Sequence, residues 1–423
     1  MSNTVGSRKV LRGLALAAVA ILMGIIMESP TEVSAFLPQT RSSLPSNWES
    51  SSRFQPRSTG TRETRVFMAG GFGSPTQSSS KKKKGKAKKK GGVSQSPEKI
   101  KLQWANKLKR VYGGTSAEEI AAGTEKRIGI MMKETLDESI RKALELREVV
   151  QGFERQIVGM DAETLRQRFT KEQIDQAIEN RRAFEEHCEA NEIYPHDLQV
   201  AMQRLTWDAS ADAKACRSVT GNMPTPIKNR VTKASEMAYE AIGDDDDLVL
   251  DVGCGYGVMV PFLKKAGFKA KQIHGVDLSS EMIEHAKSFY PDVARKGKFE
   301  ALDFFAETKE EDSNKYRSVV FCSALHDMPD LRTALLKTKY ELLDKETPGS
   351  RLVIVHAQGA SHVLNQNKQN PLLVPRGLPT KEELEEWLCG EDGGRAMKLI
   401  HEPADPRSPG ETREGYLAVL ETI

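Results

Sequence analysis

The chain lacks the cysteine pattern of a disulfide-stabilised or zinc-binding protein. Its five cysteines among 423 residues are odd in number, widely scattered, and include no C-x-x-C pair. The sequence therefore predicts neither a disulfide framework nor a metal site, and it suits an interior, reducing location. The apolar run 13–27 holds only 15 residues, whereas a membrane span needs about 20. We therefore expect no stable membrane insertion of the mature chain.

Acidic residues are scarce in one part of the chain. Residues 1–95 contain 16 Lys/Arg and 4 Asp/Glu, a net charge of +12, so the overall +3 leaves −9 for residues 96–423. The body of the protein is thus mildly acidic, which argues against a main surface that binds polyanions. An apolar fraction of 38% suffices for a true core, and this length predicts two or three segments of domain size.

The first residues read as targeting sequence rather than as a folded domain. Basic residues precede the run 13–27, and the small residues of Val33-Ser-Ala35 fit a cleavage site. Residues 1–35 are therefore predicted to be a signal peptide, with an uncleaved anchor as the alternative. Residues 36–69 are rich in Ser, Thr and Arg and poor in acids, which is typical of a transit peptide. Together they resemble the bipartite presequences of algae with complex plastids, and the resemblance implies the plastid stroma.

A lysine block separates this region from the rest of the chain. Residues 81–90 include eight lysines and no aromatic residue, flanked by Ser- and Gly-rich sequence. Such a block repels itself, so residues 70–95 are predicted to be a disordered linker. Nonspecific contact with RNA or anionic lipid is the alternative.

Residues 96–215 are predicted to form a helical domain. Apolar residues recur every three or four positions from 136 to 157. Thr170 and Gln173 have the spacing of a capping box ahead of another such pattern. Three roles are open for this domain: a substrate lid, a partner-binding module, or an oligomerisation surface. The sequence predicts no oligomeric state.

A glycine-rich turn follows a short buried strand. Residues 248–252 read Leu-Val-Leu-Asp-Val, the continuous apolar run of a strand that is covered on both faces. Gly253, Gly255 and Gly257 follow at alternate positions, where a Cβ would block a ligand or forbid a positive φ. A helix expected to begin near Val258 would direct its free N–H groups at an anionic ligand group.

The spacing of this turn discriminates between nucleotide ligands. A dinucleotide fingerprint needs its third glycine at position 258, which is Val258. The pattern Asp251-x-Gly-x-Gly-x-Gly257 instead resembles the first motif of class I S-adenosylmethionine-dependent methyltransferases. Strands expected at 274–279, 299–304, 316–323 and 351–356 extend the resemblance. Acids at their ends then take defined roles: Asp277 would bind the ribose hydroxyls, and Asp303 would lie beside the adenine amino group.

The resemblance implies a set of cofactor-binding residues, all of them at strand ends or in the turns that follow. They are Asp251, Gly253, Cys254, Gly255, Gly257, Asp277, Leu278, Met282, Asp303, Phe304 and Cys322. Taken singly, each admits another explanation: the turn by tight strand-helix packing, Asp277 by an N-cap role. Taken together, packing does not explain carboxylates at three successive strand ends, where open α/β sheets bind ligands. Cys254 and Cys322 read as small packing residues.

The predicted fold is α/β: a Rossmann-like seven-stranded methyltransferase sheet over residues 216–423, preceded by the all-helical domain and the targeting region. A helix over 226–241 would pack on the sheet. A helix start is expected at Thr380, and the antiparallel pair 397–401 and 415–420 closes the sheet, as the family usually does. Residues 356–375 show no periodicity and are expected to shape an acceptor pocket.

The residues after the fourth strand bear on the methyl acceptor. No Asn-Pro-Pro-Tyr sequence occurs there, and Cys322-Ser-Ala-Leu-His-Asp-Met-Pro-Asp330 resembles small-molecule methyltransferases more than nucleic-acid ones. His326 is a candidate general base, and a cap histidine bonded to Asp327 is its alternative; His356 is a second candidate. The sequence thus predicts a plastid enzyme that methylates a small molecule. A plastid RNA or protein methyltransferase, or a noncatalytic cofactor-binding protein, are the alternatives.

Overall fold

The computed structural model describes residues 97–157, 159–221, 223–369, 373–390, 396–404 and 415–423. The targeting and linker predictions for residues 1–95 lie outside this part of the chain. The described residues divide into two compact units, one of residues 134–198 and one of residues 97–133 and 199–423. None of the described helices is both long enough and apolar enough to cross a bilayer.

The first unit is helical. It contains α4 (Glu138–Ile157), α5 (Ala162–Arg168), α6 (Lys171–Ala190) and the start of α7 (Pro195–Thr220). Thr170 caps α6 and Gln173 bonds back to it, so the predicted capping box is confirmed. A small core forms around Leu165, Ile174 and Ile178.

Three further helices belong to the second unit: α2 (Pro97–Tyr112), α3 (Ala117–Thr135) and the greater part of α7. The hydroxyl of Tyr112 donates to the carbonyl of Ala209 at 2.9 Å, which joins α2 to α7. Asp212 on α7 pairs with Lys107 of α2 at 2.5 Å and with His285 at 2.9 Å. The expected boundary after residue 215 therefore falls inside a continuous helix.

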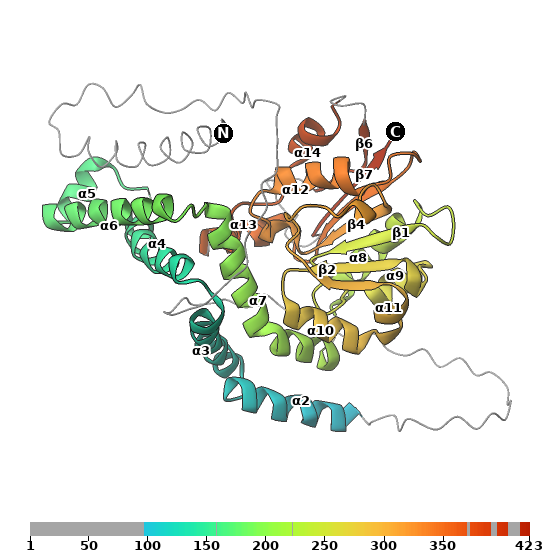
Figure 1. Cartoon of the computed structure of the whole chain (residues 1–423), viewed down its shortest axis with the longest axis horizontal. Helices are drawn as coiled ribbons and strands as arrows, with labels where there is room; N and C mark the ends of the chain where they lie inside the picture. Colours follow the sequence, from blue (N-terminus) through green and yellow to red (C-terminus); the bar gives the residue numbers. More distant parts are fainter. Residues whose placement is uncertain (1–96, 158, 222, 370–372, 391–395, 405–414) are drawn as a thin grey trace. The chain divides into compact units, whose positions relative to one another are not determined.

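The rest of the second unit is an α/β sheet structure (Figure 1). Its strands are β1 (Leu248–Val252), β2 (Ile273–Asp277), β3 (Lys298–Ala301), β4 (Tyr316–Cys322), β5 (Arg351–His356), β6 (Met397–His401) and β7 (Tyr416–Thr422). Its helices are α8 (Thr225–Tyr239), α9 (Val260–Ala266), α10 (Ser280–Phe289), α11 (Pro291–Lys296), α12 (Leu331–Lys337), α13 (Ala360–Gln369) and α14 (Lys381–Leu388). Short 3₁₀ turns lie at Ala270–Gln272, Glu310–Asp312 and Leu325–Asp327, and a π-helical turn lies at Thr338–Leu342.

The strand order of the sheet is β3-β2-β1-β4-β5-β7-β6. The first five strands run parallel, and β7 pairs antiparallel with both β5 and β6. The order reverses between β1 and β4, which makes their carboxyl ends the topological switch point, the usual ligand position in such sheets. The predicted seven-stranded Rossmann-like fold with a preceding all-helical region is confirmed.

Both faces of the sheet are covered. Leu250 and Val252 of β1 belong to one apolar cluster, together with residues of α12, α13 and α14. Val249 belongs to the cluster on the opposite face, with residues of α8, α9, α10 and α11. The alternation explains why β1 reads as an uninterrupted apolar run: either orientation of a side chain meets a buried layer.

Two local expectations were wrong. Residues 356–375 were expected to be irregular, but α13 lies within them; only Ala360 and Val363 bury apolar side chains there, too few to produce a periodic signal. The helix expected near Val258 begins at Val260. The helix start at Thr380 is confirmed with a full capping box.

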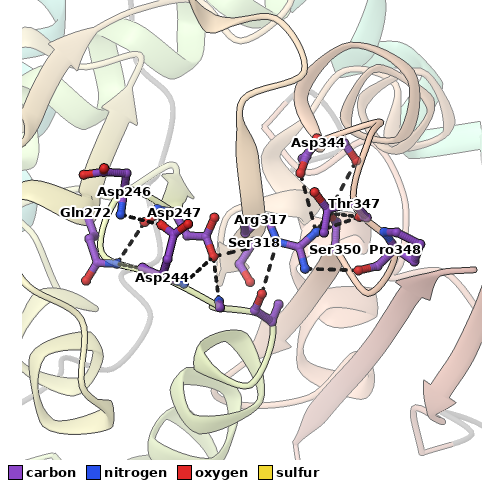
Figure 2. A network of polar contacts seen from close by, with 12 residues as sticks. Asp244, Asp246, Asp247, Gln272, Arg317, Ser318, Asp344, Thr347, Pro348 and Ser350 are labelled. Atoms are coloured by element: carbon purple, nitrogen blue, oxygen red, sulfur yellow. Dashed lines mark hydrogen bonds and ion pairs between the residues drawn. The ribbon is translucent and has the colours of Figure 1, made fainter.

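A buried arginine ties together the end of the sheet opposite the switch point. Arg317 in β4 is only 8% exposed. Its guanidinium donates to the carbonyls of Ala241, Thr347 and Pro348 and to the hydroxyl of Ser350, at 2.6–3.2 Å. Figure 2 shows this network beside the aspartates of the loop before β1. It fixes the loops at one end of the sheet, while ligand-facing residues lie at the other.

Candidate functional site

A cavity of about 200 Å³ opens at the carboxyl ends of β1, β2 and β4, beside the switch point. It is lined by all of the predicted site residues except Gly257: Asp251, Gly253, Cys254, Gly255, Asp277, Leu278, Met282, Asp303, Phe304, Cys322 and His326. The topology brings residues 75 positions apart in the chain to one place, since parallel strands end at the same edge.

The three glycines of the turn serve different purposes. All have positive φ: +67° at Gly253, +54° at Gly255 and +84° at Gly257. A Cβ on Gly253 would lie 2.4 Å from Cβ of Ala324, and one on Gly257 would lie 2.7 Å from the ring of Tyr290. A Cβ on Gly255 would meet no heavy atom within 4 Å. Packing therefore requires two of the glycines, and Gly255 borders the open space of the cavity.

Asp277 joins the ends of β1 and β2. One carboxylate oxygen accepts the N–H of Gly255 and the other accepts the N–H of Ser279, both at 2.8 Å. Ser279 itself caps α10, so the alternative explanation of Asp277 as an N-cap is wrong. Burial raises the pKa of Asp277 to about 6, although the two N–H donors act against the rise. Part of the anionic charge expected at the glycine turn is thus supplied by Asp277.

Asp251 is the least satisfied group of the site. It is 1% exposed, and neither carboxylate oxygen has a hydrogen-bond partner among the described residues. Burial, and then the nearby charge of Asp277, raises the pKa of Asp251 well above its usual value. A buried carboxyl without a donor is unfavourable, so Asp251 suits a ligand that brings a cationic or hydrogen-bonding group.

The remaining predicted residues form the walls of the cavity. The carboxylate of Asp303 accepts the N–H of Phe305 at 3.0 Å just beyond β3. Met282 is buried in the first turn of α10. Burial raises the pKa of both Cys254 and Cys322 far above the usual thiol value. These thiols remain protonated at neutral pH, which agrees with a packing role and not with a nucleophilic one.

His326 lies in the 3₁₀ turn after β4. Its Nε2 is 3.5 Å from a carboxylate oxygen of Asp327, while its buried Nδ1 has no partner among the described residues. Burial, with the charge of Lys214, lowers the pKa of His326 to about 4. The expectation that its pKa suits neutral pH was therefore wrong. The ring is neutral at physiological pH, and one nitrogen remains available to a ligand.

His356 is differently placed. Its ring meets that of His326 edge-on, with centroids 4.7 Å apart. Its Nδ1 accepts the N–H of Gln358 at 3.2 Å, so this nitrogen is occupied by the backbone. Of the two histidines considered from the sequence, His326 is the one with a free nitrogen at the cavity.

One side of the cavity is formed by α7, which the sequence analysis did not include in the site. Gln203, Trp207, Lys214 and Arg217 of this helix line the cavity. Asp208 accepts the hydroxyl of Ser279 and the N–H of Glu281, which fastens α7 to the first turn of α10. Such long-range contacts leave no motif in the sequence. The one available signal is a lysine set among the buried residues Ala211, Ala213, Ala215 and Cys216.

Opposite charges meet where α7 passes the end of β4. Burial lowers the pKa of Lys214 to about 8. Burial raises the pKa of Asp327 to about 7, with the charge of Lys214 acting against the rise. The side chain of Gln203 donates to the carbonyl of Asp327, which holds the 3₁₀ turn against α7. Two groups that titrate near neutral pH therefore lie at the entrance to the β4 end.

Metal chemistry finds no ligand set here: the part of the chain that the structure describes contains no group of three or more His, Cys, Asp or Glu side chains arranged to hold an ion.

Comparison with known proteins gives a family match for part of the chain. Residues 249–346 match the family model described as "Methyltransferase domain". This segment runs from β1 beyond α12 and includes most of the cavity residues. Among curated proteins, the mitochondrial ubiquinone biosynthesis O-methyltransferase of Candida albicans is 29% identical over 133 residues, which is 31% of this chain and 35% of that protein. The chain thus spans about a third of the length of this relative.

Solved structures with similar folds include an S-adenosylmethionine dependent methyltransferase from Mesorhizobium loti. It is 16% identical with a TM-score of 0.33, and the match covers 44% of this chain and 97% of that one. A magnesium protoporphyrin IX methyltransferase from Synechocystis, solved with bound SAH, is 19% identical with a TM-score of 0.35. That match covers 53% of this chain and 98% of the other.

Proposed function

We propose that the chain is an S-adenosylmethionine-dependent methyltransferase that acts on a small molecule in the plastid stroma. The observation that carries this proposal is the pair Asp251 and Asp277 beside the open glycine turn at the switch point. Both are buried acids with raised pKa values, and Asp251 has no donor among the described residues. The match of residues 249–346 to a methyltransferase domain supports the same activity.

The residues present fit this cofactor. Asp277 has spare lone pairs for two ribose hydroxyls because each oxygen accepts only one backbone N–H. Asp251 suits the cationic methionine end, and the space over Gly255 admits the chain that joins the two. Asp303, Phe304 and the residues of α10 remain for the adenine. When bound, S-adenosylmethionine supplies a methyl group on a sulfonium, which departs as a neutral thioether once an acceptor atom takes the methyl.

His326 is the chain's proposed base. With Asp327 beside Nε2, the ring keeps its proton there, and Nδ1 is free to accept one from an acceptor hydroxyl. The acceptor oxygen then carries the electron pair that forms the new bond to carbon. Because burial lowers the pKa of His326 to about 4, the ring is a weak base that is always in the correct state near neutral pH. Orientation of donor and acceptor supplies the remainder of the effect.

A small acceptor is favoured because α7 lines one side of the cavity and leaves about 200 Å³. An RNA or protein substrate would have to displace this helix or enter as a single side chain or base. Binding of the full chain to total RNA at two salt concentrations tests that alternative: phosphate-driven binding weakens steeply with salt.

The activity is tested with the full chain. Calorimetry should give a dissociation constant for S-adenosylmethionine and for its demethylated product, and incubation of a metabolite extract with methyl-labelled cofactor should label a small molecule. Absence of binding to either form of the cofactor would contradict the proposal. Binding without label transfer to any extract would favour the noncatalytic alternative.

Location is tested separately. A fluorescent protein preceded by residues 1–75 should reach the plastid, and Phe36→Ala should divert it into the secretory system, because Phe36 follows the expected cleavage site. Secretion of the unaltered fusion, or plastid delivery without residues 1–35, would refute the bipartite interpretation.

A further inference from the structure

Two cations of α7 face the cavity one helical turn apart. Lys214 and Arg217 both line it, as expected for positions i and i+3 on one helix face. They act on different neighbours. Arg217 influences Tyr256 of the glycine turn, whereas Lys214 influences His326 and Asp327 at the end of β4. The two charges therefore serve different ends of the cavity.

The ammonium of Lys214 is not neutralised by the described residues. It lies 4.3 Å from the ring centroid of Trp207, and no hydrogen bond or ion pair joins it to any of them. Asp327 acts on it only at a distance, since no ion pair within 4.0 Å connects the two. A cation held at a largely apolar wall without a counterion is unfavourable, so the structure leaves room for an anion there.

We propose that Lys214 binds an anionic group of the methyl acceptor, so that the acceptor is a small acid whose apolar body lies against Trp207. This inference rests on the proposed function. The site lies beside His326, the proposed base, whereas the acids that suit the cofactor lie at the ends of β1, β2 and β3. The wall around Lys214 includes Val200, Trp207 and Met328, which favours an apolar body for the molecule that carries the charge.

A carboxylate at this position has two conceivable sources, the acceptor and the methionine end of the cofactor. Arg217 is better placed for the cofactor, because it lies near Tyr256 within the glycine turn. Lys214 lies near the β4 end, where the acceptor must approach the methyl group. The two sources are separated by experiment with S-adenosylmethionine and its decarboxylated analogue.

The test uses the full chain saturated with S-adenosylhomocysteine, with benzoate and benzamide as probes of equal shape and different charge. Benzoate should bind about tenfold more tightly than benzamide, the factor that one charge-assisted hydrogen bond supplies. Lys214→Met should abolish this preference, and Lys214→Arg should retain most of it. Arg217→Met is the matched control: it should weaken the cofactor but keep the preference for benzoate.

Three results would overturn the inference. The first is no preference for benzoate in the unaltered chain, including binding of neither probe. The second is a preference that survives in Lys214→Met. The third is a loss of S-adenosylmethionine affinity in Lys214→Met that vanishes with the decarboxylated analogue, which would assign Lys214 to the cofactor. Failure of the proposed function is distinct, because it appears as absent S-adenosylhomocysteine binding in the unaltered chain.

Discussion

Replacement of Asp277 by alanine tests the central contact of the proposed cofactor site. Each oxygen of this carboxylate accepts one backbone N–H at 2.8 Å and keeps a lone pair for a ribose hydroxyl. Two hydrogen bonds to a charged acceptor contribute about 1.5–3 kcal/mol each. Asp277→Ala should therefore weaken S-adenosylmethionine by about 3–6 kcal/mol, or roughly 10²- to 10⁴-fold.

The same carboxyl predicts a pH dependence of binding. Its pKa in the free protein is about 6, and the hydroxyls bind its ionised form, so binding is strongest above pH 6 and weakens as the pH falls below it. At pH 5 about one carboxyl in eleven is ionised, which should weaken binding about tenfold relative to pH 7.5. Near pH 6, binding should release about half a proton, measurable by calorimetry in buffers of different ionisation enthalpy.

Calorimetry of the full chain from pH 5 to pH 7.5 measures both effects. Asp292→Ala is the matched control, because it removes an acid of the same unit that pairs with Lys264 at 2.6 Å away from the cavity lining. Its affinity should equal that of the unaltered chain. If Asp277→Ala keeps the slope between pH 5 and 7, the titrating group is Asp251 and the reasoning about Asp277 is refuted.

Three further substitutions test other parts of the structure. His326→Asn should lower turnover roughly 10²- to 10⁴-fold and leave the melting temperature nearly unchanged, because Nδ1 has no partner to lose; a large fall in melting temperature would favour a structural role. By denaturant unfolding, Gly255→Ala should cost about 1–2 kcal/mol of stability from its positive φ alone, and Gly253→Ala about 1–3 kcal/mol more because its Cβ meets Ala324; equal costs would refute the packing argument. Arg317→Met should cost about 3–5 kcal/mol with an unaltered cofactor dissociation constant; a smaller loss with weakened binding would contradict the view that the network is purely structural.

The sequence predicted the sheet well because its signals are local. Each strand is a short apolar run, and acids or glycines mark where the first strands end, so Asp251, Asp277 and Asp303 were placed at the correct edge from the chain alone. The closing pair β6 and β7 was found in the same way. The capping boxes at Thr170 and Thr380 succeeded for a similar reason, since a cap involves residues only three positions apart.

The parts that escaped prediction depend on distant contacts or on weak patterns. Lys214 reaches the cavity only because α7 folds across the strand ends, and its neighbours His326 and Asp327 lie more than a hundred residues later in the chain. The pKa of His326 was misjudged because burial, which the sequence does not report, outweighs the residue's ordinary value. The helix α13 was missed because only two of its residues bury apolar side chains.

A continuous chain of hydrogen bonds explains why α7 belongs to the site as well as to the helical region. Asp277 accepts the N–H of Ser279, the hydroxyl of Ser279 donates to Asp208, and Asp208 also accepts the N–H of Glu281. One residue of α7 is therefore joined through a single serine to the proposed ribose partner. A ligand that fixes Asp277 also fixes the cap of α10, and with it the helix that carries Lys214 and Arg217. The acids of the strand ends and the cations of α7 thus form one site, in which cofactor binding positions the groups proposed to receive the acceptor.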